Sequence, residues 1–350
     1  YTSHTLVKAA ADTFTAGQLD QLIKHSDGRG LIGILGAQPV DGKLKGPDDW
    51  AVANNAVTMT DLAMFAAGKI CGVSKLNAEL IIKNIPQHAP RVIGAVTNAV
   101  HPDWAAPSIA ELFNQYAPGW KTNPDELGKL ADLKENQEFR KKLWGAHMEA
   151  KLALRSFIEQ SREEITSSGL DPDIFARDLD PNVFTVGIAK RVVHYKRLGL
   201  LFHIMEELLK TVSKDRPIQF VFAGKAHPND DKWNGGKAIL QKVLQAGKLL
   251  NEKHSDRFKF IFLPNYDPEK ARMIIPGVDV WLNNPIWGEE ASGTSPMDAI
   301  LNAVLMLTIN DGCIPEMVSR GEFGWTFGLA GKRQEDDNYE FDATHLYDRL

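Results

Sequence analysis

Basic side chains gather in one short stretch of this 350-residue chain, where Lys190, Arg191 and Lys196 follow a predicted strand. Arginine offers a planar fork of donors and lysine a compact charge, and together they can hold a phosphate group. In a dry cleft, such cations stabilise the negative charge that develops on a phosphate when a bond to it breaks. The alternative is a solvated basic helix start, but cations there oppose the helix dipole. We therefore predict that Arg191 and Lys196 are catalytic and that Lys190 binds the donor.

A second stretch combines acidic and small residues: Glu290-Ala291-Ser292-Gly293-Thr294-Ser295-Pro296-Met297-Asp298. The small side chains of Ser292, Gly293 and Thr294 let backbone amides approach a sugar or phosphate closely. Ser295 and Pro296 are typical of an N-cap and the first residue of a helix whose N-terminus could face an anion. Three interpretations of Asp298 stay open. They are a capping box with Ser295, a ligand for ribose hydroxyls, and an ion pair with Lys190 or Lys196.

The pattern after residue 183 predicts the elements that position these side chains. Short β-branched or aromatic runs predict strands at 183–188, 218–223, 258–263, 278–282 and 305–309. Helices are expected between them, at 198–212, 236–250 and 296–304. This alternation is typical of a doubly wound parallel sheet, which binds ligands at the carboxyl ends of its strands. Most of the basic and acidic candidates fall just after predicted strands.

The earlier part of the chain has a different pattern. Helical spacing occurs over 6–23, turn-rich breaks over 28–30 and 41–47, and a long apolar helix or helix pair over 58–82. Residues 102–160 are helical and increasingly charged, with the longest amphipathic run at 136–162. We predict the end of an N-terminal lobe at 1–97 and a C-terminal phosphate- and sugar-binding lobe at 98–350.

Composition excludes several classes of protein. The net charge is −5 with both signs scattered, so no basic surface indicates nucleic acid. No apolar run reaches the length of about 18 residues that a membrane span needs, and no secretory signal begins the chain. The two cysteines are far apart, and we expect a cytoplasmic protein. Because the chain begins with Tyr1 and its last helix has no capping glycine, we expect it to be a piece of a longer polypeptide.

Six motifs in order along the chain resemble those of the α-glucan (glycogen and maltodextrin) phosphorylases. The loop Glu290-Ala291-Ser292-Gly293-Thr294 resembles their active-site loop, and Lys190-Arg191 with Tyr195-Lys196-Arg197 resembles their basic motif. The other matches are Tyr1-Thr2-Ser3-His4-Thr5, Gly72-Val73-Ser74-Lys75 within 59–80, Thr97-Asn98, Ala223-Gly224-Lys225-Ala226-His227-Pro228, and Asp311-Gly312 with Glu316. The resemblance implies an α/β fold of the two-lobed GT-B class, whose donor lobe is a doubly wound parallel sheet.

The resemblance also implies roles for individual residues. Glu290 matches a residue that binds the sugar hydroxyls, and His4 and Asn98 match residues that contact the transferred sugar. Tyr266 matches a tyrosine that packs on the pyridoxal ring, so it would either stack a nucleobase here or fill the core. Lys225 and His227 are candidates for the same crevice.

Asp298 is the main departure from the family. The phosphorylases have at this position a lysine that carries pyridoxal phosphate as a Schiff base, and an aspartate has no amine with which to form it. The acidic residues at 290 and 298 instead resemble the E-x7-E pattern of nucleotide-sugar transferases. We therefore predict a retaining glycosyltransferase that uses a nucleotide-diphosphate sugar and needs neither pyridoxal phosphate nor a metal.

Two alternatives to this function remain. One is a true α-glucan phosphorylase that binds pyridoxal phosphate without the lysine, and the other is a non-catalytic sugar-binding homologue. In the main interpretation the partners are a small-molecule sugar donor and an unidentified acceptor, without nucleic acid or membrane, and a homodimer is left open.

Overall fold

The computed structural model describes residues 1–4, 13–15, 38–40, 43–45, 51–52, 56–230, 235–318, 323–328 and 335–350. The chain divides into two compact units. The first comprises Tyr1–Asn98, Gly288–Ser292 and Asp311–Ser319, and the second comprises Ala99–Trp287, Gly293–Asn310 and Arg320–Leu350. The predicted lobe boundaries at 1–97 and 98–350 stay a prediction, and each unit is described separately below.

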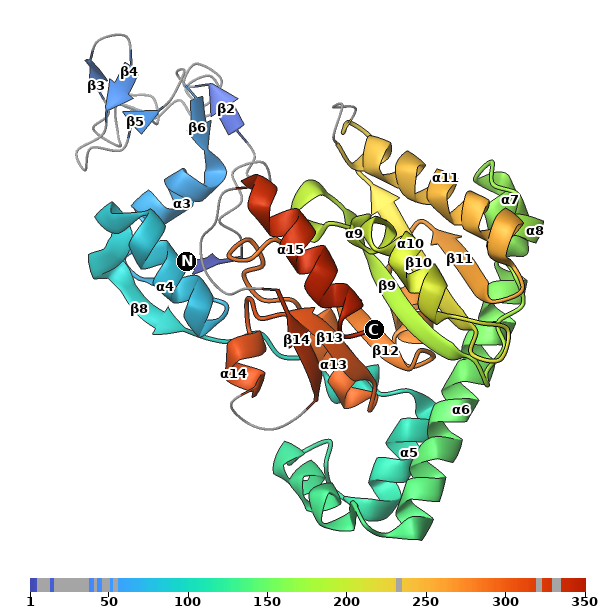
Figure 1. The fold of residues 1–350 in the computed structure, drawn as a ribbon. Coiled ribbons are helices and arrows are strands. Elements are labelled where there is room, and N and C mark those ends of the chain that lie inside the picture. The colour runs from blue at the N-terminus through green and yellow to red at the C-terminus, as the bar shows by residue number, and fades with distance from the viewer. Residues whose placement is uncertain are drawn as a thin grey trace. The chain divides into compact units, whose positions relative to one another are not determined.

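The second unit is built on a six-stranded parallel sheet with the order β11-β10-β9-β12-β13-β14 (Figure 1). Its strands are β9 (Phe184–Val192), β10 (Ile218–Ala226), β11 (Phe258–Pro264), β12 (Val280–Asn283), β13 (Leu305–Ile309) and β14 (Gly324–Phe327). The first three strands add in one direction and the last three in the other, so the order reverses between β9 and β12. This confirms the predicted α/β class with a doubly wound parallel sheet.

The strands are mostly apolar because both faces of a parallel sheet are covered. In β10 every residue from Ile218 to Gly224 is buried, and β11 contributes Phe258, Phe260 and Phe262 to the same core. The ring planes of Phe222 and Phe260 meet with centroids 4.7 Å apart. In β9, Gly187 leaves room for a close approach, because a Cβ there would lie 2.9 Å from the side chain of Val278.

Helices and short helical turns connect the strands of the second unit. They are η4 (Pro102–Trp104), α5 (Pro107–Tyr116), η5 (Pro124–Leu133), α6 (Gln137–Gln160), α7 (Arg162–Ser167), α8 (Pro172–Phe175), η6 (His194–Lys196), α9 (Leu200–His203), α10 (Met205–Thr211), α11 (Gly236–His254), α12 (Pro268–Ile274), α13 (Ser295–Leu301) and α15 (Glu335–Tyr347). The longest, α6, confirms the amphipathic run predicted at 136–162, and the Asn136 side chain caps it by accepting from the Phe139 N–H at 3.0 Å.

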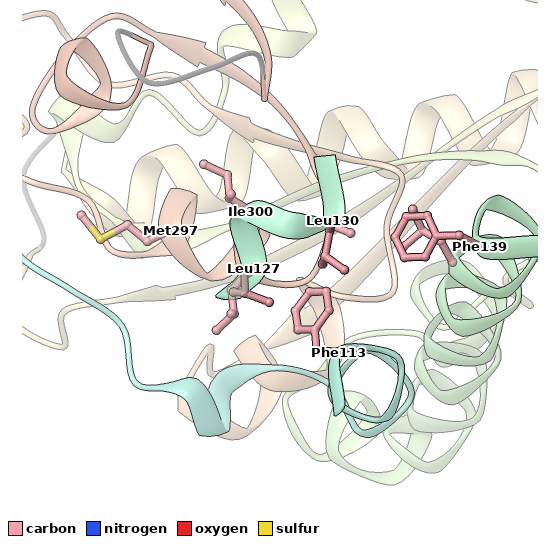
Figure 2. A pocket seen from close by; sticks show the side chains of 9 residues that line it. Phe113, Leu127, Leu130, Phe139, Met297 and Ile300 are labelled. Atoms are coloured by element: carbon pink, nitrogen blue, oxygen red, sulfur yellow. The ribbon is translucent and has the colours of Figure 1, made fainter. Parts of the chain in front are cut away.

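An apolar cavity of about 460 Å³ lies among helices of the second unit (Figure 2). It is lined by Phe113, Leu127, Leu130, Phe139, Leu143, Met297, Ile300, Leu301 and Ala303. No charged side chain lines it, so it has nothing with which to hold a phosphate. The anion site must therefore be sought elsewhere in this unit.

The first unit contains a small parallel sheet with the order β1-β7-β8, formed by β1 (Thr2–Ser3), β7 (Ile70–Gly72) and β8 (Val92–Ala95). Its helices and turns are α3 (Met59–Ala66), α4 (Lys75–Asn84), η3 (Pro86–Arg91) and α14 (Ile314–Val318). Short antiparallel strands complete the described part: β2 (Thr13–Thr15), β3 (Gln38–Val40), β4 (Lys43–Lys45), β5 (Ala51–Val52) and β6 (Ala56–Thr58).

Several predicted elements need correction. The helical spacing over 6–23 contains strand β2, and the rest of that range, like the break at 28–30, lies outside the described residues. The predicted break at 41–47 contains strand β4. At 58–82 the helix pair, one of the two predicted alternatives, is present as α3 and α4, but strand β7 lies between the helices and was not predicted, because Gly68 and Gly72 interrupt the helical pattern. The helix predicted at 198–212 is divided at Ile204 into α9 and α10.

Candidate functional site

Lys190 lies at the point where the order of the large sheet reverses. It is near the end of β9, and its Nζ donates to Oδ1 of Asn284, the residue after β12, at 2.6 Å. Both side chains are buried. Ligands of doubly wound sheets bind outside the carboxyl ends of the strands at such a reversal. The structure therefore places the predicted donor-binding lysine where this fold binds ligands.

Arg197, which the sequence did not single out as functional, anchors this region. Its backbone is left-handed with φ 45°, and its buried guanidinium donates to the carbonyls of Asn284 at 3.0 Å and Pro285 at 2.7 Å. The same guanidinium donates to Asp342 Oδ2 on α15 at 2.8 Å, and Asn284 Nδ2 donates to the Arg197 carbonyl at 2.8 Å. Arg197 and Asn284 thus fix the end of β12 against the segment after β9.

The two predicted catalytic cations differ from Arg197 in their exposure. Arg191 is exposed, and Lys196 is half-buried with its ammonium 5.1 Å from the centroid of the Tyr195 ring. Strand β9 continues to Val192, so Arg191 lies within the strand and not after it, and Lys196 lies in the turn η6. The next α-helix begins only at Leu200, so neither Arg191 nor Lys196 lies at the start of an α-helix.

Asp298 occupies an unusual position in α13. It is 5% exposed, and its Oδ1 has no hydrogen-bond partner among the residues that the structure describes. Burial raises the pKa of this carboxyl to about 6, and the positive charge of Arg272 opposes that rise. No ion pair joins Asp298 to Lys190 or Lys196 within the described ranges.

The predicted helix cap is also wrong. Helix α13 includes Ser295, and Thr294 stands at the N-cap without a side-chain hydrogen bond. Instead of capping, Ser295 Oγ accepts from Trp281 Nε1 at 3.2 Å. Asp298 therefore forms no capping box, and its backbone is held only by the helix itself, through Thr294 and Asn302.

Tyr266 follows β11 and is half-buried against the main core of the second unit. Burial raises the pKa of its phenol, and the negative charges of Asp298 and Asp267 raise it further. The other two candidates of this unit, Lys225 and His227, are exposed at and just after the end of β10. Gly293 is half-buried and Thr294 exposed in the segment that leads into α13.

In the first unit, Asp311 organises the loop that contains Glu290. Its Oδ2 accepts from the backbone N–H groups of Gly288 at 2.9 Å and Glu290 at 3.0 Å, and its Oδ1 accepts from Gly312 at 2.8 Å. Burial nevertheless raises the pKa of Asp311 to about 7. Glu290 is itself buried beside this carboxyl. The sequence offered a signal for this role only in the Asp311-Gly312 motif.

Hydrogen bonds bring four separated motifs of the first unit together. Ser74 Oγ donates to the Ala291 carbonyl at 2.6 Å, and Asn98 Nδ2 donates to the Ser292 carbonyl at 3.4 Å. Glu316 accepts from the backbone of Lys75 and from Thr97 Oγ1, both at 2.8 Å. Asn98, Glu290 and Ser292 are thus part of one cluster. His4 is exposed at the end of β1.

The parallel sheet, with the order of its strands reversing between β9 and β12, is that of an α/β protein of the GT-B class. The family model for carbohydrate phosphorylases matches residues 1–348, and the chain belongs to this family. The whole chain is 35% identical to 40% of the glycogen phosphorylase of Mycobacterium tuberculosis. It is 32% identical to 49% of the glycogen phosphorylase of Aquifex aeolicus and 31% identical to 41% of the maltodextrin phosphorylase of Thermococcus litoralis. The chain therefore spans less than half the length of these relatives.

These findings correct the predicted donor and cofactor. A family of carbohydrate phosphorylases takes inorganic phosphate and pyridoxal phosphate, so the prediction of a nucleotide-diphosphate sugar without a cofactor is wrong. The ribose interpretation of Asp298 and the nucleobase interpretation of Tyr266 depended on that donor and lose their support with it. The family resemblance itself is confirmed.

The residue at 298 does not fit the covalent attachment of pyridoxal phosphate. The attachment needs an amine, and the side chain there is a buried carboxyl with an unpartnered oxygen. Among helices of the described ranges, none is long and apolar enough to cross a bilayer.

Proposed function

We propose that the protein containing this chain is an α-glucan phosphorylase, which converts a glucan and inorganic phosphate into glucose 1-phosphate and a shortened glucan. Family membership supports this function, and the observation that carries it to named residues is the position of Lys190 and Asn284 where the sheet order reverses. The exposed Arg191 and the half-buried Lys196 belong to the same stretch. The substrates are small molecules and glucan chains, and we keep the cytoplasm as the proposed location.

Arg191 and Lys196 act on the phosphate in this proposal. The bond between the sugar C1 and the glycosidic oxygen breaks, a bond between C1 and a phosphate oxygen forms, and a phosphate proton passes to the departing glucan hydroxyl. Fixed cations stabilise the phosphate charge while the proton leaves it. Lys190 is held by Asn284 and adds positive charge from the buried side of the sheet.

The cluster of the first unit holds the sugar in this proposal. Glu290 accepts hydrogen bonds from sugar hydroxyls, and Asn98, Ser292 and His4 supply further polar contacts. Asp311 positions Glu290 through two backbone N–H groups of its loop. A positioned carboxylate can orient the sugar ring for attack, which lowers the barrier by avoiding reorientation.

One observation favours a second candidate function, that of a non-catalytic homologue that binds sugar phosphates. Asp298 removes the lysine that the family uses, and a protein without turnover would tolerate this loss. Such a homologue would keep the binding residues and lose phosphorolysis. The two candidates therefore differ in turnover and agree in binding.

The test is phosphorolysis of maltoheptaose by the complete protein, with glucose 1-phosphate measured as product and titration calorimetry with glucose 1-phosphate alongside. We expect turnover, and we expect Arg191→Ala to lower kcat/KM by roughly 100- to 1000-fold with the fold intact. Lys196→Ala should behave similarly, and the double variant should lose less than the sum if both cations act on one phosphate. Lys129→Ala, at an exposed pair on η5, is the control. Binding without turnover would establish the second candidate, and neither binding nor turnover would overturn both.

A further inference from the structure

Two exposed cations stand side by side at the carboxyl end of the large sheet. Lys225 of β10 is in register with Arg191 of β9, and neighbouring strands are about 4.8 Å apart. Both side chains are exposed. Like charges at paired positions of a sheet repel each other, so this arrangement is unfavourable unless an anion binds between them. The strand order reverses beside β9, which is where a doubly wound sheet binds its ligands.

Both side chains point to the face of the sheet on which α13 begins. The Cβ position of Gly187 in β9 faces the Trp281 ring, and Arg191 shares that face because it lies four residues further along a strand whose side chains alternate. Lys225 lies on the same face through its register with Arg191. Trp281 Nε1 donates to Ser295 Oγ at 3.2 Å, and Ser295 is the first residue of α13. The two cations therefore face one common space.

The charge of this pair is not neutralised within the part of the chain that the structure describes. There, neither Arg191 nor Lys225 has a side-chain hydrogen bond or an ion pair. The carboxylate that follows β10, Asp230, instead accepts from the Gly236 N–H at 2.6 Å, at the start of α11. Lys190 is the neighbour of Arg191 in the sequence but points to the opposite face of the sheet, so it does not compete for the same anion.

We infer that Lys225 and Arg191 together bind one phosphate dianion, either inorganic phosphate or the phosphate group of glucose 1-phosphate. The inference rests on the proposed function, in which Arg191 acts on phosphate, and it adds a second cation to that site. The planar fork of Arg191 can bind two phosphate oxygens while the ammonium of Lys225 binds a third. Lys225 interacts with the phosphate charge before and during the reaction, so its loss should raise KM for phosphate and leave kcat nearly unchanged.

The test is titration calorimetry of the complete protein with inorganic phosphate and, separately, with glucose 1-phosphate. Lys225→Met removes the charge and keeps most of the side-chain length, and we expect it to raise both dissociation constants about tenfold. Lys225→Arg keeps the charge and should stay within about threefold of the wild type. Lys248→Met, at an exposed position of α11 beside Glu252, is the matched control and should change neither constant.

A double variant shows whether the two cations bind the same anion. If they do, Arg191→Ala combined with Lys225→Met should weaken phosphate binding by less than the product of the two single effects. In the phosphorolysis assay, Lys225→Met should raise KM for phosphate about tenfold and keep kcat within about twofold of the wild type. Lys225→Glu reverses the charge at the same exposed position and should bind phosphate more weakly than Lys225→Met.

Several outcomes would overturn the inference. They are unchanged dissociation constants in Lys225→Met, an equal loss of affinity in Lys248→Met, independent effects in the double variant, and no binding of either probe to the wild type. Weaker phosphate binding in Lys225→Met without any phosphorolysis by the wild type would leave the inference standing and remove the proposed function. Phosphorolysis with an unchanged KM for phosphate in Lys225→Met would leave only the proposed function standing.

Discussion

Two aspartates of the second unit, the half-buried Asp279 and the buried Asp298, show how differently one fold treats a carboxyl. Asp279 precedes β12, and its oxygens meet His147 Nε2 at 2.8 Å, Lys151 Nζ at 2.7 Å and the Thr185 N–H at 2.7 Å. Burial alone would raise the pKa of Asp279, but the hydrogen bonds from His147 and Lys151 outweigh it and hold the pKa below its usual value. Asp298 has no such partner for Oδ1, and its pKa rises to about 6.

The difference separates a carboxylate with several hydrogen-bond donors in the fold from one whose Oδ1 has none among the described residues. Asp279 ties α6 to β9, because its partners come from the helix and from the strand. Removing it would leave the buried ammonium of Lys151 with only the Val183 carbonyl. The carboxyl of Asp298 joins no two elements among the described residues, so replacing it should raise the free energy of unfolding. A buried charge that contributes no stability is a candidate for function.

The largest expected effect is the loss of the Asp279 partner set. Asp279→Ala should lower the free energy of unfolding by about 3 to 5 kcal/mol at pH 7, because Lys151 stays buried without its counter-charge. Urea denaturation followed by circular dichroism measures this change. Asp178→Ala, which removes an exposed bidentate pair with Arg155, is the matched control and should cost about 1 kcal/mol or less. Equal losses of unfolding free energy in the two variants would show that Asp279 contributes no more to stability than an exposed ion pair.

An intermediate loss of stability is expected on replacing Asn284, whose neutral amide accepts a hydrogen bond from the buried ammonium of Lys190. Asn284→Ala removes the acceptor of Lys190 and the donor to the Arg197 carbonyl, and should cost about 2 kcal/mol of unfolding free energy. Asn284→Asp keeps the acceptor and adds a charge, so it should recover part of that loss. Thermal denaturation of the three proteins in phosphate-free buffer measures both changes. If the aspartate variant is the less stable of the two, Lys190 is not held through Asn284.

The large sheet could be predicted from the sequence because its strands are buried on both faces. Runs such as those of β10 and β11 are mostly apolar, and each is followed by a helical pattern, which leaves a parallel sheet as the consistent arrangement. The region before residue 98 was less predictable. Strand β7 is three residues long and lies between two apolar helices, so periodicity merges it with them.

Only part of the candidate site could be predicted from the sequence. Motifs identify which residues belong to it, and hydrogen bonds from distant segments decide what each residue does. Arg197 stands in the same basic motif as Lys196, yet only the structure shows that its guanidinium donates hydrogen bonds to two carbonyls and to Asp342. The missing hydrogen-bond partner of Asp298 could not be predicted either, because the Ser295-x-x-Asp298 pattern is the same whether the carboxyl caps the helix or has no partner. The donor was predicted wrongly because one changed residue was given more weight than six matching motifs.

The smallest expected effect is also the most direct test of the comparison, and it concerns Asp298→Asn. The pKa of Asp298 in the folded protein is about 6, above the usual value of about 3.8, so the native state binds its proton more tightly than the unfolded chain. The stability from that proton is present below about pH 4 and is lost as the pH rises through 6. The asparagine variant has no such loss.

Asp298→Asn should therefore match the wild type near pH 4 and exceed it in free energy of unfolding by about 1 to 2 kcal/mol at pH 7.5. The positive charge of Arg272 and the neutral phenol of Tyr266 are the same in both proteins, so the difference between their urea denaturation curves isolates residue 298. For Asp279 we expect the opposite pH dependence of stability. A carboxyl with a lowered pKa stabilises the protein above about pH 4, and this contribution is lost as the pH falls through its folded pKa. If Asp298→Asn were instead destabilising at pH 7.5, the carboxylate would have a donor in the folded protein. Asp298 would then be a structural charge of the same kind as Asp279.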